Sequence, residues 1–256
     1  MKVNVCNVLV DQFDFDEVVE AIVEHALSGA KPSYVIPHNT QCVVLLQKDA
    51  HFREICKDAF LVVPDGVPLL WAASFLRTPL RGRVNGTDLF EHLCAIAGER
   101  GLKIFFLGGR PGSAVNAAKT LCARYSDLDI VGTYCPPYGF ESDTAELAKI
   151  NETIKAAAPH ILFVGLGAPK QEYWIYANHQ ETGVPISIAV GGSFELVAGV
   201  VKRAPKWMQK LGLEWFYRLL KEPRRLWQRY LVCNTLFIWL VLKQRLGLLR
   251  SEQSSS

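Results

Sequence analysis

The stretch VGLGAPKQEYWI, residues 164–175, joins a buried apolar run to an aromatic, helix-like segment through a turn rich in polar groups. The apolar residues ILFVGL precede Gly167, and Pro169 suits the first turn of a helix. A plain connection between a strand and a helix needs only one capping residue. The lysine, glutamine and glutamate that follow the proline therefore indicate a turn that holds a ligand.

Around this stretch, short apolar runs alternate with amphipathic segments of helical length. Continuous apolar strands that alternate with helices are typical of a parallel sheet covered on both faces. The sequence therefore predicts an α/β fold, with a Rossmann-like, mostly parallel sheet flanked by helices. Strands are expected over 33–37, 60–64, 103–108, 129–134, 160–167 and 186–192, and helices over 88–100, 113–125, 143–157 and onward from an N-cap at Asp16.

Three of the expected strands end in glycines before a predicted helix, in KIFFLGGRPGS, ILFVGLGAPKQ and ISIAVGGSFE. Ser113 and Ser193 are the expected N-caps of two of these helices. Glycine allows a close backbone approach, and helix N-termini at the carboxyl ends of parallel strands bind anions. One such turn is explained by a tight connection alone, but three together favour a nucleotide or phosphate pocket. No turn matches a Walker A loop or a complete GxGxxG, which disfavours a P-loop NTPase and a dinucleotide oxidoreductase.

The 256 residues are 50% hydrophobic and 21% charged, which indicates a globular chain of one large or two small domains. The N-terminal sequence MKVNVCNVLVDQFDF has no uninterrupted apolar segment, so no signal peptide is predicted and a cytoplasmic protein is expected. Seven scattered cysteines without a CxxC pair predict reduced thiols rather than disulfides or a zinc site.

Positive charge is concentrated towards the C-terminus. Residues 202–229 hold nine Lys/Arg against two Asp/Glu, whereas residues 1–201 have a net charge of −6. This asymmetry indicates an anionic partner, either a phosphate, a nucleic acid or a membrane surface. Tryptophan and leucine mixed with Lys/Arg is typical of a helix in a membrane interface, although a helix docked on the body or on another subunit explains it too. Pro223 predicts a break into two amphipathic helices, and the 12-residue apolar run 231–242 is shorter than the roughly 20 residues that span a bilayer.

Polar residues near other predicted strands are candidates for chemistry. Asp65, in VVPDGVPLLW, follows an apolar strand and can act as a general base, or bond its own backbone in a turn. Asn39, after SYVIPH, can hydrogen-bond a sugar or a base, or serve as a turn residue. Arg83 precedes a helix with a Thr/Asp cap and is available to a diphosphate, while Tyr138 in CPPYGF can stack on a base or lie in a surface turn.

Two acidic pairs, Asp14/Asp16 and Asp127/Asp129, imitate the DxD motif that holds a divalent ion. The second pair precedes a strand, at the wrong end of a parallel sheet for the expected pocket. Both pairs are therefore expected to be structural, and no metal or resident cofactor is predicted. The charge of a diphosphate would then be met by Lys/Arg and backbone amides.

Several of these stretches, taken in order, resemble the WecG/TagA/CpsF family of bacterial glycosyltransferases over about residues 5–230. They are PDGVPLLW, RVNGTDLF, FFLGGRPG, IVGTYCPPYGF, VGLGAPKQEYWI, AVGGSFELVAGVVKRAPKW and GLEWFYRLLKEPRR. The resemblance implies transfer, with inversion and without a required metal, of a sugar from a UDP-sugar to an undecaprenyl-diphosphate-linked saccharide at the inner membrane face. The sugar would be N-acetylmannosamine-like, a hexose or a uronic acid.

The resemblance also implies roles for single residues. Asp65 matches the catalytic base, and Arg218, Arg224 and Arg225 fall in the segment that meets the lipid diphosphate. Two positions depart from the family pattern: Pro37 replaces a common threonine, so that any role of its hydroxyl is absent or is taken by Thr40, and glutamate replaces aspartate in GGSFE. With the glycine turns and CPPYGF, the expected substrate-binding set is Asn39, Arg83, Gly108, Tyr138, Gly167, Gln171, Gly191, Gly192 and Glu195.

The expected organisation is a UDP-sugar-binding core over 1–201, a basic appendage over 202–250 that contacts acceptor and membrane, and a disordered tail over 251–256. A chain truncated after residue 201 is expected to fold and to bind UDP. An anionic membrane is expected as a partner rather than nucleic acid, and a homo-oligomer is left open. Two rival hypotheses are a Rossmann-type nucleotide-sugar epimerase or dehydrogenase, for which no glycine fingerprint or Tyr/Lys or Cys set is found, and an anionic-lipid-binding protein.

Overall fold

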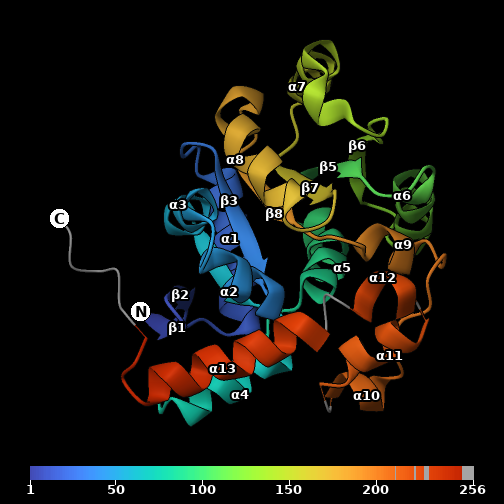
Figure 1. Cartoon of the computed structure of the whole chain (residues 1–256). Coiled ribbons are helices and arrows are strands. Elements are labelled where there is room, and N and C mark those ends of the chain that lie inside the picture. The colour runs from blue at the N-terminus through green and yellow to red at the C-terminus, as the bar shows by residue number, and fades with distance from the viewer. Residues whose placement is uncertain (211, 222, 228–230, 250–256) are drawn as a thin grey trace. The chain divides into compact units, whose positions relative to one another are not determined.

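The computed structural model describes residues 1–210, 212–221, 223–227 and 231–249 (Figure 1). The chain divides into two compact units. Unit 1 combines Met1–Asp14, Pro37–Asn85 and the segment from Arg203 onward, and unit 2 combines Phe15–Ile36 and Gly86–Lys202. The predicted boundary at residues 201–202 lies next to the point where the chain passes from unit 2, at Lys202, to unit 1, at Arg203. However, unit 1 also includes Met1–Asp14 and Pro37–Asn85, which were predicted to belong to the core. The predicted tail, 251–256, lies outside the described residues.

A six-stranded sheet confirms the predicted α/β class. Its strand order is β4-β3-β8-β7-β5-β6, and the ladders β3–β8, β8–β7, β7–β5 and β5–β6 are all parallel (Figure 1). Strand β3 belongs to unit 2 up to Ile36 and to unit 1 beyond it. The strands are β3 (Ser33–His38), β4 (Leu61–Pro64), β5 (Lys103–Gly108), β6 (Asp129–Tyr134), β7 (Ile161–Gly165) and β8 (Ile186–Ala189).

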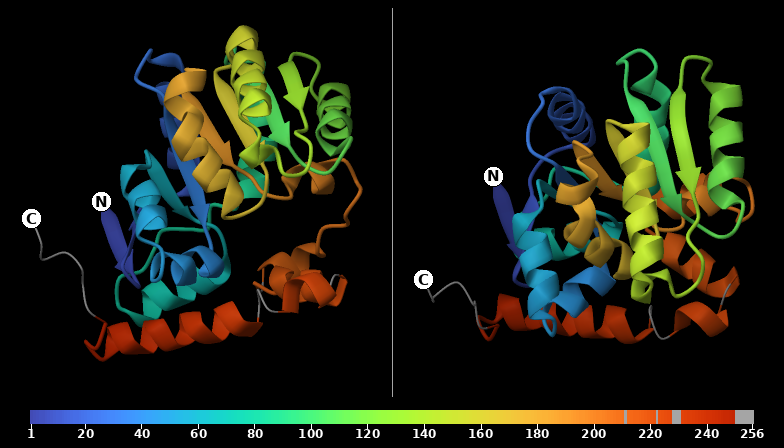
Figure 2. Two further views of the ribbon diagram at one scale, coloured as in Figure 1. Left: turned by 45° about the horizontal axis from the view of Figure 1, so that its top comes forward. Right: turned by 90° about the horizontal axis from the view of Figure 1, so that it is seen from above.

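Unit 2 has an aromatic core formed by buried phenylalanines, and its strands and helices are seen in two further views in Figure 2. The rings of Phe90 and Phe163 lie 4.8 Å apart edge to face, and those of Phe106 and Phe194 stack at 5.0 Å. All four side chains are fully buried. Aromatic pairs of this geometry stabilise a core beyond the area that they bury. The helices are α1 (Phe15–Leu27), α5 (Gly86–Ala97), α6 (Ser113–Arg124), α7 (Thr144–Ala157), α8 (Lys170–Thr182) and α9 (Ser193–Val197), with a short 3-10 turn at Phe140–Ser142.

Unit 1 contains an antiparallel hairpin that the sequence analysis missed. Strands β1 (Lys2–Val5) and β2 (Val8–Asp11) are joined by two residues with positive φ, Cys6 at 52° and Asn7 at 66°. The hairpin is tied to β4 because the backbone N–H of Val62 donates to the buried Asp11 carboxylate at 2.9 Å. A Cys-Asn turn carries no Gly or Pro, so the usual sequence signal of a hairpin is absent.

The C-terminal segment forms four described helices, so the prediction of two was wrong. They are separated in part by Gly212, which has a φ of 69°, and by Pro223, which begins a helix instead of only interrupting one. Unit 1 contains α2 (Thr40–Leu46), α3 (Ala50–Asp58), α4 (Val67–Phe75), α10 (Lys206–Lys210), α11 (Glu214–Lys221), α12 (Pro223–Trp227) and α13 (Cys233–Arg245).

Helix α13 is docked on unit 1 alongside α4 (Figure 2). Its Phe237, Leu240 and Val241 are buried. The side chain of Gln244 accepts a hydrogen bond from the backbone N–H of Cys6 at 2.6 Å and donates to the Asn4 carbonyl at 2.9 Å. The helix therefore belongs to the packed structure of this unit.

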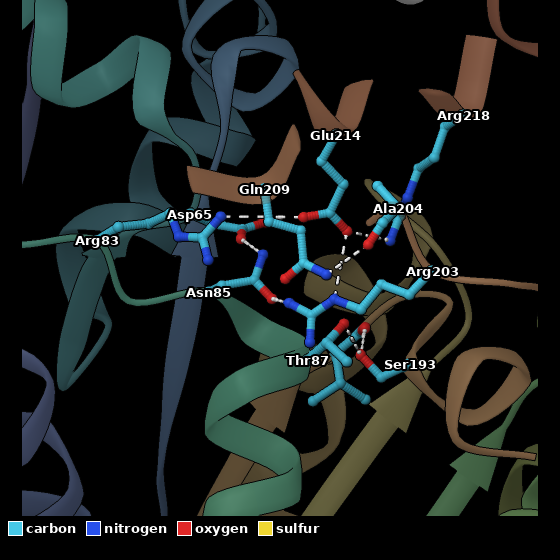
Figure 3. Close-up of polar contacts among 11 residues, drawn as sticks. Asp65, Arg83, Asn85, Thr87, Ser193, Arg203, Ala204, Gln209, Glu214 and Arg218 are labelled. Atoms are coloured by element: carbon cyan, nitrogen blue, oxygen red, sulfur yellow. Dashed lines mark hydrogen bonds and ion pairs between the residues drawn. The ribbon is translucent and has the colours of Figure 1, made fainter. Parts of the chain in front are cut away.

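Three predicted helix caps were wrong by one or two residues. Helix α1 begins at Phe15, so Asp16 lies in its first turn. Gly112 and Gly192 occupy the N-cap positions of α6 and α9, which makes Ser113 and Ser193 the first helical residues. The Ser193 hydroxyl is 2.9 Å from that of Thr87 at the start of α5, a buried contact within unit 2 (Figure 3).

Candidate functional site

The three glycine turns follow neighbouring strands of unit 2, as predicted. Strands β8, β7 and β5 are adjacent and parallel, so their carboxyl ends lie at one edge of the sheet. The backbone N–H of Gly109 donates to the Gly165 carbonyl at 2.8 Å. A Cβ atom on Gly108 would lie 2.9 Å from that carbonyl, so glycine is required for the close approach of these two turns.

The side chain of Gln171 joins two of the turns. It is buried, and its Oε1 accepts hydrogen bonds from the backbone N–H groups of Gly167 at 3.2 Å and Gly191 at 3.0 Å. Its Nε2 donates to Glu172 at 2.9 Å. The structure thus gives Gln171 a part in fixing the turns, and its contact with a ligand stays a prediction.

Glu195 places a carboxylate among the same turns. Its Oε1 accepts a hydrogen bond from the backbone N–H of Arg110 at 2.7 Å. Its Oε2 is buried and has no hydrogen-bond partner among the described residues. Burial, together with the Glu195 charge, raises the pKa of the nearby Cys135 thiol. A buried oxygen that lacks a donor suits a ligand that supplies one, whereas Gly192 beside it is exposed.

Tyr138 and Lys170 meet near the 3-10 turn of unit 2. The Tyr138 ring is fully exposed, with the Lys170 ammonium 5.8 Å from its centre. Lys170 also forms an ion pair with Glu141, and its hydrogen bond lowers the pKa of that carboxyl. Lys170 is therefore engaged by protein. The exposed tyrosine is compatible with a surface turn as well as with stacking, so its contact with a base stays a prediction.

Asp65 lies directly after β4 in unit 1. Its backbone N–H donates to the His38 carbonyl at 2.8 Å, and its Oδ1 accepts a hydrogen bond from Asn85 Nδ2 at 2.7 Å (Figure 3). The side chain is half-buried. A carboxylate that is held in one orientation and partly shielded from water is suited to accept a proton from a bound hydroxyl group.

A cluster of charged side chains continues from this aspartate within unit 1 (Figure 3). Asn85 Oδ1 accepts a hydrogen bond from Arg203 Nη2 at 3.3 Å. Glu214 forms ion pairs with Arg203 at 3.7 Å, Arg83 at 3.9 Å and Arg218 at 3.4 Å. We call Arg83, Arg203, Arg218 and Glu214 the arginine cluster.

Asn85, Arg203 and Glu214 were not predicted as site residues. Each lies in a stretch that carries the family resemblance, in RVNG, KRAP and GLEW respectively. An Asn before Gly is explained by a turn and a Glu at a helix start by the helix dipole, so neither carried a signal of its own.

Asn39 caps a helix in unit 1. Its Oδ1 accepts hydrogen bonds from the backbone N–H groups of Gln41 at 3.0 Å and Cys42 at 3.3 Å, at the start of α2. The structural alternative for this residue is therefore confirmed, and a sugar contact stays a prediction. Pro37 is buried in β3, and the Thr40 hydroxyl donates to Asn234 Oδ1 at 2.9 Å, where it helps to dock α13.

The other predicted arginines lie on α12. Arg224 is exposed, and the side chain of Arg225 lies outside the described part of the structure. Among the side chains that the structure describes, Arg218 lies in the arginine cluster, and the roles of Arg224 and Arg225 stay predictions.

The acidic pairs make structural contacts or lie away from the glycine turns. Asp14 forms an ion pair with Arg81 at 2.8 Å within unit 1. Asp127 and Asp129 lie at the amino end of β6, opposite to the carboxyl ends where the glycine turns begin. Among the described residues, no group of three or more His, Cys, Asp or Glu is arranged to hold a metal ion.

The cysteines are free thiols, as predicted. Burial raises the pKa of Cys6 to about 12, and burial followed by the Glu91 charge raises that of Cys94. Such thiols are protonated at neutral pH and do not serve as nucleophiles. Across the described ranges, no helix has the length and apolar character needed to cross a bilayer.

Comparison with known proteins gives one consistent result. A sequence profile of the Glycosyl transferase WecG/TagA/CpsF family matches residues 3–251. The chain is 30% identical over 213 residues to the N-acetylglucosaminyldiphosphoundecaprenol N-acetyl-beta-D-mannosaminyltransferase of Bacillus subtilis (strain 168), covering 83% of this chain and 80% of that protein. Proteins of the same name are 29% identical, over 227 residues in Bacillus spizizenii (87% and 86% covered) and over 229 residues in Staphylococcus aureus (strain MW2) (88% and 87%).

Proposed function

The chain belongs to the WecG/TagA/CpsF family of glycosyl transferases, and from this premise we propose that it transfers N-acetylmannosamine to N-acetylglucosamine linked to diphosphoundecaprenol. The names of its relatives describe this reaction. One observation carries the proposal: a carboxylate, Asp65, is joined through Asn85 to a cluster of three arginines. Unit 1 thus supplies both Asp65, as a base for the acceptor hydroxyl, and three arginines, as countercharge for a diphosphate.

The proposed mechanism is a direct displacement. Asp65 accepts the proton of the acceptor hydroxyl as its oxygen bonds to the anomeric carbon of the donor sugar. The bond between that carbon and the diphosphate breaks, the electron pair leaves with the nucleoside diphosphate, and the anomeric configuration is inverted. General-base catalysis of this kind contributes roughly 10²- to 10⁴-fold to the rate.

The donor is proposed to be a UDP-sugar bound at the glycine turns of unit 2. Backbone N–H groups of such turns and of the following helices can hydrogen-bond phosphate oxygens. Glu195 Oε2, buried without a donor among the described residues, can accept a hydrogen bond from a nucleoside hydroxyl or imino group. The exposed ring of Tyr138 supports stacking on a uracil base.

The acceptor lipid requires contact with a membrane, for which unit 1 offers one surface. Trp71 of α4 is 58% exposed, and Ile238 and Trp239 of α13 are 59% and 52% exposed. Two cations lie over aromatic rings of this surface: Lys243 is 3.6 Å from the centre of Trp239, and Arg245 is 5.9 Å from that of Phe75. Exposed aromatic and aliphatic groups beside Lys/Arg support peripheral binding to the anionic inner face of the plasma membrane.

Transfer to a defined acceptor tests the proposal. Purified protein is incubated with UDP-N-acetylmannosamine, UDP-glucose or UDP-glucuronic acid and a short-chain polyprenyl-diphosphate-linked N-acetylglucosamine, and products are identified by mass spectrometry. We expect a disaccharide from the first donor only. Turnover of a nucleotide sugar without the acceptor, or dependence on NAD, would instead support the nucleotide-sugar modifying enzyme.

A further inference from the structure

Glu214, the first residue of α11, faces three arginine side chains of unit 1. Its Oε1 is 3.7 Å from Arg203 Nε and 3.4 Å from Arg218 Nη2, and its Oε2 is 3.9 Å from Arg83 Nη1 (Figure 3). The Glu214 side chain is only 13% exposed, so solvent screens these ion pairs less than it screens surface pairs. One carboxylate thus meets three guanidinium groups, and the formal charges of these four side chains sum to +2.

The three arginines come from separate parts of the sequence. Arg83 precedes α5, Arg203 follows α9 and Arg218 lies one turn beyond Glu214 on α11. Like charges repel, so the arginines converge only if a countercharge offsets their repulsion. Glu214 supplies that countercharge from the first residue of α11, and the net positive formal charge of the cluster suits an anion such as a diphosphate.

Asn85 connects the cluster to the catalytic aspartate. Its Nδ2 donates to Asp65 Oδ1 at 2.7 Å, which requires its Oδ1 to act as the acceptor towards Arg203 at 3.3 Å. Arg203 in turn contacts Glu214 at 3.7 Å. The Asn85 amide therefore links the Asp65 carboxylate to Arg203 and, through Arg203, to Glu214.

We infer that Glu214 and Asn85 are positioning residues for the transfer reaction. Glu214 holds Arg83, Arg203 and Arg218 together as a diphosphate-binding cluster. Asn85, oriented by Arg203, holds Asp65 in the geometry and ionised state that a general base needs. The inference rests on the proposed function for its kinetic consequences, whereas its binding consequence is measured without sugar transfer.

Pyrophosphate binding to the full chain tests whether Glu214 holds the arginines together as a diphosphate-binding cluster. Isothermal titration with inorganic pyrophosphate compares wild type with Glu214→Gln, Glu214→Asp and the control Glu54→Gln, an exposed glutamate of the same unit. Loss of the countercharge should weaken binding about tenfold in Glu214→Gln. Glu214→Asp, which keeps the charge, should recover part of the loss, and the control should match wild type. Circular dichroism confirms that each variant is folded.

Tighter pyrophosphate binding by Glu214→Gln would overturn this part, because Glu214 would then be a competing anion that the ligand displaces. Equal binding in wild type and Glu214→Gln would overturn it too, and so would the absence of pyrophosphate binding by wild type. Each of these results holds whether or not the protein transfers N-acetylmannosamine. Failure of transfer alongside weaker binding by Glu214→Gln would overturn the proposed function and keep the cluster.

The pH profile of kcat/KM tests the part of Asn85. Removal of a hydrogen bond to an ionised carboxylate raises its pKa, so Asn85→Ala should move the acid limb of the profile to higher pH. Asn85→Asp has nearly the same shape but adds a like charge, so its shift should be larger. A fall in kcat with an unchanged KM for the lipid acceptor should accompany both shifts. An acid limb that coincides with that of wild type in Asn85→Asp would overturn the positioning of Asp65 by Asn85.

Discussion

At the scale of single residues, Asp65 is held by hydrogen bonds of both its backbone and its side chain. Its backbone N–H donates to the His38 carbonyl at 2.8 Å, which holds the main chain of Asp65 in place. The Asn85 amide donates to its Oδ1 at 2.7 Å, which orients the carboxylate. The Asn85 amide donates a hydrogen bond to Asp65, and the ionised carboxylate can accept it. Asparagine at position 65 would keep the shape and an acceptor for Asn85, but it could not take up a proton.

The variant Asp65→Asn should therefore lose activity by a factor on the order of 10² to 10⁴ while UDP affinity changes little. Initial rates with the lipid-linked acceptor and calorimetric titration with UDP measure the two effects. Asp58→Asn, the same substitution at an exposed position of unit 1, is the control. Turnover by Asp65→Asn within a few fold of wild type would show that another group accepts the proton.

His38 is fully buried beside Phe52, and burial lowers its pKa from 6.5 to about 3. Below pH 6.5 the unfolded chain therefore binds a proton that the folded chain does not, and stability falls as pH falls towards 3. Between pH 7 and pH 5 this residue should lower the free energy of unfolding by about 2 kcal/mol. Urea unfolding of wild type and His38→Gln at both pH values measures the effect. Between pH 7 and pH 5, the free energy of unfolding should fall by about 2 kcal/mol less in the variant than in wild type. Equal pH dependence in both proteins would contradict it.

The positions of Asp127 and Asp129 predict the response to chelation. Both lie at the amino end of β6, and the arginine cluster supplies positive charge that a divalent ion would otherwise bring. Excess EDTA should therefore leave most of the transfer rate intact. A loss of rate that Mg²⁺ or Mn²⁺ restores would show that a metal takes part, and Asp127→Asn with Asp129→Asn would then test whether this pair binds it.

At the scale of elements, α4 and α13 have two different faces. The inner face of α13 buries Phe237 and Leu240, whereas Ile238 and Trp239 are exposed. Helix α4, which packs against α13 in unit 1, exposes Trp71 and Phe75. We expect an exposed apolar face on a helix that is already docked to contact a second partner. The adjacent Lys243 and Arg245 favour an anionic bilayer as that partner.

Replacement of Ile238 and Trp239 by glutamine should thus weaken membrane binding. Co-sedimentation with phosphatidylglycerol vesicles should fall at least several fold, because the variant loses apolar burial in the interface. Wild type should bind vesicles of phosphatidylcholine alone more weakly, and added salt should weaken binding to the anionic vesicles. Val115→Gln, at an exposed position of α6, is the control. Unchanged sedimentation together with dissociation of a dimer in analytical ultracentrifugation would assign this face to a second copy of the chain.

At the scale of the whole molecule, the sequence predicted what depends on local pattern. Strands 103–108 and 129–134 have their predicted bounds, and each of the three predicted glycine turns follows a strand. It did not predict contacts between distant segments. Asn85 meets Arg203 across 118 positions of the sequence, and no spacing or periodicity reports such a pair. The same holds for the grouping of the C-terminal segment with residues 1–14 and 37–85.

That grouping changes what truncation is expected to do. The sequence predicts a core that ends at residue 201, but α13 contributes Phe237, Leu240 and Val241 to the buried part of unit 1. Its removal would expose the apolar groups that they cover, at roughly 1.5–3 kcal/mol for each large side chain. Unit 2 keeps its own core around Phe90 and Phe163.

A chain truncated after residue 201 should therefore lose structure in unit 1 and keep it in unit 2. Hydrogen exchange followed by mass spectrometry should show rapid exchange in peptides from 37–85 and retained protection in peptides from 103–189. A chain that ends after residue 249 should exchange like the full chain, since it keeps every described helix. Full protection of 37–85 in the shorter chain would mean that the segment from Arg203 onward is a separable appendage. Loss of protection confined to 37–85 would instead mean that this segment completes the unit that carries Asp65, so that the catalytic base and the arginine cluster fold together.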